Sequence, residues 1–143
     1  TIVEFGSSFG ISAIYLSSAL PPGGRFTGSE MEPNKVSQAR RNLESAGLAD
    51  VAEIRSGDAL ETLAKPMDRP IDLLFLDGWK DLYVPILELL TPRLRSGSVV
   101  LADNIYTFKR ELAEFVATVS NPDNGFASMT LPFKSGLQYS VRM

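Results

Sequence analysis

Three oxygen-bearing side chains follow two apolar runs in the middle of the chain. Asp77 comes directly after the run Ile71–Leu76, and Asp103 and Asn104 come directly after residues 98–102, with a helix-like segment in between. If the two runs are neighbouring parallel strands, they lie about 5 Å apart and end at the same edge of the sheet. Two carboxylates and an amide oxygen are the ligands that a hard cation prefers. The composition is therefore that of a hard-cation site.

The composition also excludes several kinds of chemistry. The 143 residues include no Cys and no His, which removes thiolate and imidazole metal sites, a cysteine nucleophile and Ser-His-Asp catalysis. Catalysis must therefore use carboxylates, Lys, Tyr, Ser or a bound cofactor. The formal net charge is −3, and the basic residues are scattered apart from the doublet Arg40-Arg41. This distribution argues against a nucleic-acid partner.

The length fits a single globular domain, residues 1–143. No apolar run approaches the ~20 residues of a membrane span, and no cationic leader precedes an apolar segment. We therefore expect a cytoplasmic protein without a membrane partner. Because the chain enters a buried-type strand immediately after Thr1, we also expect that an N-terminal segment is missing.

Strands alternate with helices along most of the chain. We expect strands over residues 2–5, 25–29, 51–55, 71–76 and 98–102, and helices over residues 11–20, 33–46, 57–63, 81–94 and 109–119. Such alternation predicts right-handed βαβ units. Two final runs, 127–133 and 137–141, predict an antiparallel hairpin. The expected fold class is α/β: a Rossmann-like, doubly wound, mainly parallel seven-stranded sheet with a C-terminal antiparallel hairpin and helices on both faces.

The turn after the first strand contains glycines but lacks the spacing of a phosphate-binding loop. Glu4 lies in the strand, and Gly6 and Gly10 follow as GxxxG, whereas a helix that approaches a pyrophosphate begins with GxGxxG. A glycine turn beside an acidic residue suits a cofactor without phosphates. A purely structural tight turn is the alternative.

Two more carboxylates end the second and third strands. Glu30 follows Gly10 by ~20 residues, the position at which a carboxylate accepts hydrogen bonds from both ribose hydroxyls. Asp58 can accept a hydrogen bond from an adenine amino group. Alternatively, Asp58 caps the following helix, since Glu61 follows it as in a capping box. The two roles of Asp58 are compatible.

The glycine turn, the ribose carboxylate and the adenine-side Asp, in this order, resemble the class I S-adenosylmethionine-dependent methyltransferases. The segments LDGWKDLY and VVLADN further resemble the catechol O-methyltransferase family, in which a divalent metal, usually Mg²⁺, orients two vicinal hydroxyls. The resemblance covers residues 2–141. It implies an S-adenosylmethionine-dependent, metal-assisted O-methyltransferase that acts on a small catechol-like acceptor, and it is compatible with a homodimer.

The resemblance also implies roles for individual residues. The metal ligands fall on Asp77, Asp103 and Asn104, and a catalytic Lys falls on Lys80, where a nearby cation would depress its pKa toward that of a general base. Trp79 can cover the adenine ring. The residues implied to bind the cofactor are Glu4, Gly6, Ser8, Gly10, Ser12, Glu30, Met31, Gly57, Asp58, Ala59, Asp77 and Trp79.

Simpler interpretations of these residues carry different weight. Taken singly, Asp77 fits a helix cap, Lys80 a surface charge and Trp79 a core aromatic. The adjacent Asp103 and Asn104 are harder to explain in this way, because they end a buried-type strand at the place where ligands bind.

The chain departs from the family at two positions and at its beginning. Gly78 stands where the family often has a His that contacts adenine, and a family Glu that binds the second catechol hydroxyl falls near Met129. Family members also have N-terminal helices that cover the cofactor. The alternatives are a metal-independent methyltransferase acting on another small molecule and a cofactor-binding domain without catalysis. A nicotinamide oxidoreductase is disfavoured, because GSSFG lacks the pyrophosphate spacing.

Overall fold

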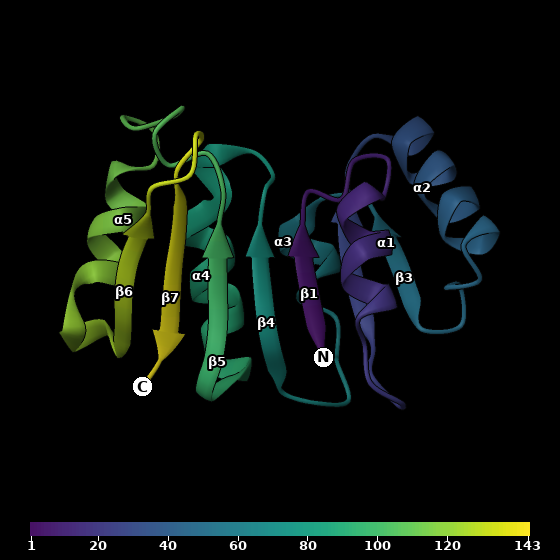
Figure 1. Cartoon of the computed structure of the whole chain (residues 1–143), viewed down its shortest axis with the longest axis horizontal. Coiled ribbons are helices and arrows are strands. Elements are labelled where there is room, and N and C mark those ends of the chain that lie inside the picture. The colour runs from purple at the N-terminus through teal and green to yellow at the C-terminus, as the bar shows by residue number, and fades with distance from the viewer.

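The computed structural model describes residues 1–143 and contains one seven-stranded sheet with helices on both faces (Figure 1). The strands are β1 (Ile2–Phe5), β2 (Phe26–Glu30), β3 (Ala52–Ser56), β4 (Ile71–Leu76), β5 (Leu94–Ala102), β6 (Phe126–Leu131) and β7 (Leu137–Arg142). The helices are α1 (Ile11–Ser18), α2 (Pro33–Ser45), α3 (Ala59–Thr62), α4 (Tyr83–Leu90) and α5 (Ala113–Ser120), with 3-10 turns η1 (Lys80–Leu82), η2 (Thr91–Arg93) and η3 (Pro122–Asn124).

The strand order is β3-β2-β1-β4-β5-β7-β6, and β7 alone runs antiparallel to its neighbours. This arrangement confirms the expected Rossmann-like sheet with its C-terminal hairpin. The order reverses between β1 and β4, since the chain winds outward from β1 to β3 and then restarts on the other side of β1. In such sheets, ligands bind beyond the carboxyl ends of the strands near this reversal.

Two apolar clusters hold the helices on the sheet. The larger cluster packs α4 and α5 against one face, and its members include the fully buried Leu74, Leu76 and Val100. The smaller cluster packs α1 and α2 against the other face over β1 to β3, and it includes Phe26 and Leu43. In Figure 1, α1 lies in front of the sheet, to the right of β1, whereas α4 lies behind the sheet.

The second face of the sheet is covered only over β1 to β3. From β4 to β6, this face consists of apolar side chains that are half-buried to exposed, because no helix packs on them. We refer to this surface as the open sheet face. Its residues are Leu73, Phe75, Val99, Leu101, Met129, Tyr139 and Val141.

Three elements differ from those expected by more than two residues at one end or by being divided. β5 begins at Leu94 and not at residue 98, because Leu94 pairs with Ile71 and the Ser98 hydroxyl bridges the register shift by donating to the Ile71 carbonyl at 2.6 Å. α5 begins at Ala113 and not at residue 109, and turns occupy residues 105–112. The segment 81–94 is divided into η1, α4 and η2. None of the helices combines the length and the apolar character needed to cross a membrane.

Candidate active site

The carboxyl ends of β1, β4 and β5 bring the predicted ligands to one edge of the sheet, here called the carboxyl edge. The Asp77 amide donates to the Phe5 carbonyl at 2.9 Å, and the Asp103 amide donates to the Leu76 carbonyl at 3.1 Å. These bonds continue the parallel ladders by one residue beyond each strand, so the two aspartates leave the sheet side by side. The expected juxtaposition of the two strand ends is confirmed.

Asp77, Lys80, Asp103 and Asn104 form one cluster at this edge. The Lys80 Nζ donates to Asn104 Oδ1 at 2.6 Å and lies 3.7 Å from Asp77 Oδ1. The Asn104 backbone amide donates to Asp103 Oδ1 at 2.7 Å, and its side-chain amide donates to Asp103 Oδ2 at 3.2 Å. Asn104 has φ +70°, a left-handed conformation that Asn tolerates better than most residues. This turn directs the Asn104 oxygen toward the ammonium group.

Burial dominates the electrostatics of the Asp77–Lys80 pair. Burial raises the pKa of the Asp77 carboxyl, and the neighbouring Asp103 adds to this effect while Lys80 opposes it. Burial also lowers the pKa of the Lys80 ammonium, although Asp77 and Asp103 act in the opposite direction. Lys80 is the more withdrawn of the two, since its side chain is 13% exposed whereas that of Asp77 is 39% exposed. The direction of the Lys80 shift favours the neutral amine relative to a lysine in water.

Two residues that the sequence analysis missed hold this cluster in place. The Tyr83 hydroxyl accepts a hydrogen bond from Lys80 Nζ at 2.8 Å, and the Ser135 hydroxyl donates to Asp103 Oδ1 at 2.7 Å. Tyr83 lies three residues after Lys80, a helical spacing that could have indicated the contact. Ser135 comes from the β6–β7 turn, which docks on the exit of β5 through the Tyr106 amide and the Ser135 carbonyl at 2.8 Å. No local sequence signal indicates that contact.

Glu4 is a buried carboxylate on the β1 side of the same edge. It is 0% exposed, and neither of its carboxylate oxygens has a hydrogen-bond partner. Burial raises the pKa of Glu4, the nearby Ser12 and Ser7 hydroxyls oppose the shift, and Asp77 adds to it. A buried polar group without a partner needs a physical explanation, and contact with a bound ligand is one of them.

Glu30 connects the end of β2 to the glycine turn. Its Oε2 accepts from the Ser8 amide at 2.8 Å and its Oε1 accepts from the Glu32 amide at 2.9 Å. Each carboxylate oxygen has a second lone pair, so the group can still accept from a ligand. Gly10, at φ +83°, is the N-cap of α1. The exposed Met31 follows Glu30 at the rim of this edge.

The end of β3 supplies Gly57, Asp58 and Ala59. The Gly57 amide donates to the Glu30 carbonyl at 3.0 Å, which places this turn beside the end of β2. Asp58 Oδ1 accepts from the Leu60 amide at 2.8 Å, so the helix-cap role considered for Asp58 is confirmed. Ala59, the first residue of α3, is buried, with only 5% of its surface exposed.

The simpler interpretations of Trp79 and Asp77 do not hold. Trp79 is 72% exposed, so it is not a core aromatic, and its indole N–H donates to Asp81 Oδ2 at 3.2 Å. Trp79 itself occupies the N-cap position of η1, and no side chain caps that turn. Asp77 is therefore not a helix cap, and it faces Lys80 instead.

The family of the chain follows from a comparison with known proteins. Residues 3–105 match the family described as Methyltransferase domain. The chain belongs to this family. The methyltransferase domain is 38% identical to a catechol O-methyltransferase of Mus musculus over 73% of the chain and 42% of that protein. It is 35% identical to a catechol O-methyltransferase of Mycobacterium tuberculosis over 79% of the chain and 51% of that protein.

Solved structures share the fold of the methyltransferase domain. An O-methyltransferase from Bacillus cereus in complex with SAH has a TM-score of 0.88 and 25% identity, over 99% of this chain and 73% of that one. The domain therefore spans about half the length of the two catechol O-methyltransferases and nearly three quarters of the Bacillus cereus enzyme.

Gly78 of the methyltransferase domain has a packing reason to lack a side chain. A Cβ atom at Gly78 would lie 2.5 Å from the Phe5 ring, and a Cβ atom at Gly6 would lie 2.5 Å from the Gly78 Cα. The first turn and the β4 exit are thus in direct contact, and the Phe5 ring fills the space that a larger residue at position 78 would need. The His expected from the family resemblance has no room here.

Met129 lies away from the cluster. It is on β6, at the edge of the sheet, and it pairs with Tyr139, which in turn pairs with Leu101 of β5. Two strand spacings, or about 10 Å, therefore separate β6 from β5. The Met129 side chain is 58% exposed on the open sheet face.

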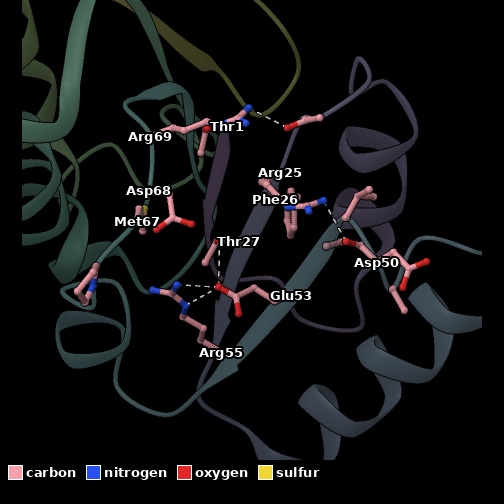
Figure 2. A pocket seen from close by; sticks show the side chains of 15 residues that line it. Thr1, Arg25, Phe26, Thr27, Asp50, Glu53, Arg55, Met67, Asp68 and Arg69 are labelled. Atoms are coloured by element: carbon pink, nitrogen blue, oxygen red, sulfur yellow. Dashed lines mark hydrogen bonds and ion pairs between the residues drawn. The ribbon is translucent and has the colours of Figure 1, made fainter.

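A hollow of about 530 Å³ lies at the opposite edge, near the amino ends of β1, β2 and β3, here called the amino edge. Figure 2 shows the side chains that line it. Several of its charged groups engage one another or the backbone: Arg55 pairs with Glu53 at 2.7 Å, and an Arg25 nitrogen donates to the Asp50 carbonyl at 3.1 Å. None of the predicted site residues lines this hollow.

Proposed function

We propose that this domain transfers the methyl group of S-adenosylmethionine to an oxygen atom of a small molecule. The observation that carries the proposal is the single edge that holds both the carboxylates Glu4 and Glu30 and the cluster around Lys80, whose pKa burial lowers. Two further observations support the proposal. The mouse and mycobacterial relatives are named catechol O-methyltransferases, and the Bacillus cereus enzyme was solved in complex with SAH.

The cofactor would lie across the ends of β1, β2 and β3. Glu30 would accept hydrogen bonds from the ribose hydroxyls, and Asp58 would accept from the adenine amino group with the oxygen that does not cap α3. The exposed Trp79 indole is free to cover the adenine ring. The Glu4 carboxylate oxygens have no hydrogen-bond partner within the chain. They would accept hydrogen bonds from the polar part of the cofactor.

We also propose that Asp77, Asp103 and Asn104 hold a divalent cation, with Mg²⁺ as the expected ion. The residues fit such an ion, because a positive charge, the Lys80 ammonium, already contacts the Asn104 oxygen and lies near Asp77. No cluster of three or more Asp or Glu side chains occurs in the domain, so the Asn104 oxygen would have to complete the set. Bound there, a divalent cation lowers the pKa of a hydroxyl that it contacts.

Lys80 would act as the general base. S-adenosylmethionine supplies an electrophilic methyl group on a sulfonium sulfur. The acceptor oxygen forms the new C–O bond as the C–S bond breaks, S-adenosylhomocysteine leaves, and Lys80 takes the hydroxyl proton. Because this is an in-line displacement, holding the acceptor oxygen on the line of the C–S bond contributes most of the catalysis.

The acceptor that we propose is a vicinal dihydroxy aromatic molecule. Transfer of labelled methyl groups to a panel of catechols, with and without EDTA, tests the proposal. We expect transfer that EDTA abolishes and added Mg²⁺ restores. Transfer that is indifferent to EDTA would indicate a metal-independent methyltransferase. Tight binding of S-adenosylhomocysteine by the full-length protein without transfer to any acceptor would indicate a binding domain without catalysis.

We further propose that residues of the full-length protein outside these 143 cover the open sheet face. Apolar side chains such as Phe75 and Leu101 are incompletely buried there, and the relatives are longer than this chain. The test compares the 143-residue chain with the full-length protein in sedimentation and in binding of a hydrophobic dye. A monomeric full-length protein that binds less dye supports the proposal. Dimerisation through this face would instead indicate a second copy as its cover.

A further inference from the structure

We propose that Tyr83 is a positioning residue whose buried hydroxyl holds Lys80 Nζ at the carboxyl edge. Its catalytic consequence rests on the proposed function, since it matters for methyl transfer only if Lys80 is the base. The contact itself is independent of that function and can be tested separately.

The Tyr83 hydroxyl connects two elements of the cluster. It accepts from Lys80 Nζ at 2.8 Å and donates to the Asp103 backbone carbonyl at 3.4 Å. Lys80 belongs to η1 after β4, whereas Asp103 follows β5. One hydroxyl group therefore fixes the position of the amine relative to the exit of the neighbouring strand.

The core fixes the Tyr83 ring. The side chain is 0% exposed, and its ring stands edge-on to Phe5 at 6.2 Å and to Phe115 at 5.5 Å between centroids. These partners come from β1 and α5, so both elements, together with α4, which carries Tyr83, hold the ring. Edge-to-face pairs of this kind favour one ring orientation. Lys80 Nζ also lies 4.9 Å from the centroid of the Tyr83 ring.

Tyr83 is the hydrogen-bond partner of Lys80 that a bound cation would leave free. The other two polar partners of Lys80 Nζ are Asn104 and Asp77, and we propose both as cation ligands. The remaining neighbour is the Phe108 ring, whose centroid lies 5.4 Å from Nζ and which has no oxygen to accept a hydrogen bond. A lysine side chain is long and flexible, so the amine needs another anchor once those oxygens are engaged. The Tyr83 hydroxyl supplies that anchor.

The chemistry of the two groups is compatible with proton transfer to Lys80. Burial strongly raises the pKa of the Tyr83 hydroxyl, so this group stays protonated and does not compete as a base. A neutral Lys80 amine can still donate one N–H to the Tyr83 oxygen. Its lone pair is then directed away from Tyr83 and remains free to accept a proton.

The test uses Tyr83→Phe, which keeps the ring and removes only the hydroxyl. Limited acetylation followed by mass spectrometry reports the contact without any need for catalysis. We expect Lys80 to be acetylated several-fold faster in the variant, while the exposed residues Lys65 and Lys109 react at unchanged rates. Unchanged labelling of Lys80 would overturn the proposal.

Kinetics test the catalytic consequence. For Tyr83→Phe we expect kcat to fall about 10- to 100-fold, as for a misplaced catalytic group, with KM for the cofactor within about twofold. Thr91→Val, which removes a hydroxyl bonded to the Leu87 carbonyl beyond the far end of α4, is the matched control and should leave kcat unchanged. Tyr83→Phe should add nothing to Lys80→Met, whereas additive losses would overturn the proposal.

The two readouts separate the failure of this inference from that of the proposed function. If the unsubstituted protein binds S-adenosylhomocysteine but methylates no acceptor, the proposed function has failed, and the labelling of Lys80 still decides whether Tyr83 holds it. If the unsubstituted protein is active and Tyr83→Phe retains its kcat, Tyr83 does not position the base.

Discussion

The carboxyl edge and the amino edge of the sheet both carry charged groups, but the two edges differ in the hydrogen-bond and ion-pair partners that these groups find within the chain. At the amino edge, the hollow of about 530 Å³ contains Glu53, held by Arg55, and Arg69, which donates to a backbone carbonyl. At the carboxyl edge, Glu4 is buried without a partner and Asn104 has a left-handed backbone. Glu53 and Arg69 at the amino edge thus have partners within the chain, whereas the buried Glu4 carboxylate at the carboxyl edge has none. The functional signal lies in groups that the chain itself leaves unsatisfied.

The Asp77–Lys80 pair shows the same difference in its electrostatics. In a structural ion pair, attraction lowers the pKa of the carboxyl and raises that of the amine. Here burial reverses both directions, raising the pKa of Asp77 and lowering that of Lys80. The pair therefore does not gain enough from its attraction to offset its burial. A ligand that contributes charges or hydrogen bonds would stabilise the charged forms of both groups.

Removing the amine at the carboxyl edge should have the largest effect. We expect Lys80→Met to lower kcat about 100- to 10,000-fold, the range that general-base catalysis contributes. Arg69→Met removes a long cationic side chain at the amino edge and should leave kcat unchanged. Initial rates at saturating substrates measure both variants, and calorimetry with S-adenosylhomocysteine shows whether the site is intact. Equal rates of Lys80→Met and the wild type would remove the functional distinction between the edges.

The packing at the carboxyl edge should be less tolerant than that at the amino edge. Gly78→Ala places a methyl group 2.5 Å from the Phe5 ring and should lower the free energy of unfolding by about 1–3 kcal/mol. Gly24→Ala places its methyl group 3.0 Å from the Leu20 side chain and from the Pro21 carbonyl oxygen, a less severe approach, and should lower the free energy of unfolding by less. Urea unfolding with linear extrapolation measures both.

A second substitution shows whether Phe5 causes the loss. Phe5→Leu in the Gly78→Ala background should recover part of the lost stability, because the two residues share one space. If the losses simply add, the Phe5 ring is not the obstacle, and the packing reason given for Gly78 is wrong.

The sequence predicted the sheet and the meeting of its strand ends because both follow from local patterns. The apolar runs and glycine turns define parallel units, and parallel units place Asp77 and Asp103 at one edge. What it could not predict depends on distant packing. Ser135 reaches Asp103 from a turn 32 residues away, and Phe5 closes the space beside Gly78 across two strand ends. The cluster was thus predictable in composition but not in the contacts that hold it.

Glu4 offers the most delicate test of the contrast between the edges. Burial raises the pKa of Glu4 above its usual 4.5 in the folded state, so the stability that its protonated form contributes is present below that value and is lost as the pH rises through the raised pKa. Glu4→Gln is neutral throughout and should exceed the wild type in unfolding free energy by roughly 1 kcal/mol at pH 8, with little difference at pH 4. Glu53→Gln at the amino edge loses the ion pair with Arg55 and should not increase the unfolding free energy at either pH. Urea unfolding at both pH values measures the four differences. Identical unfolding free energies of Glu4→Gln and the wild type at pH 8 would mean that the folded chain offsets the cost of burying the Glu4 carboxylate. The contrast drawn between the two edges would then be wrong for Glu4.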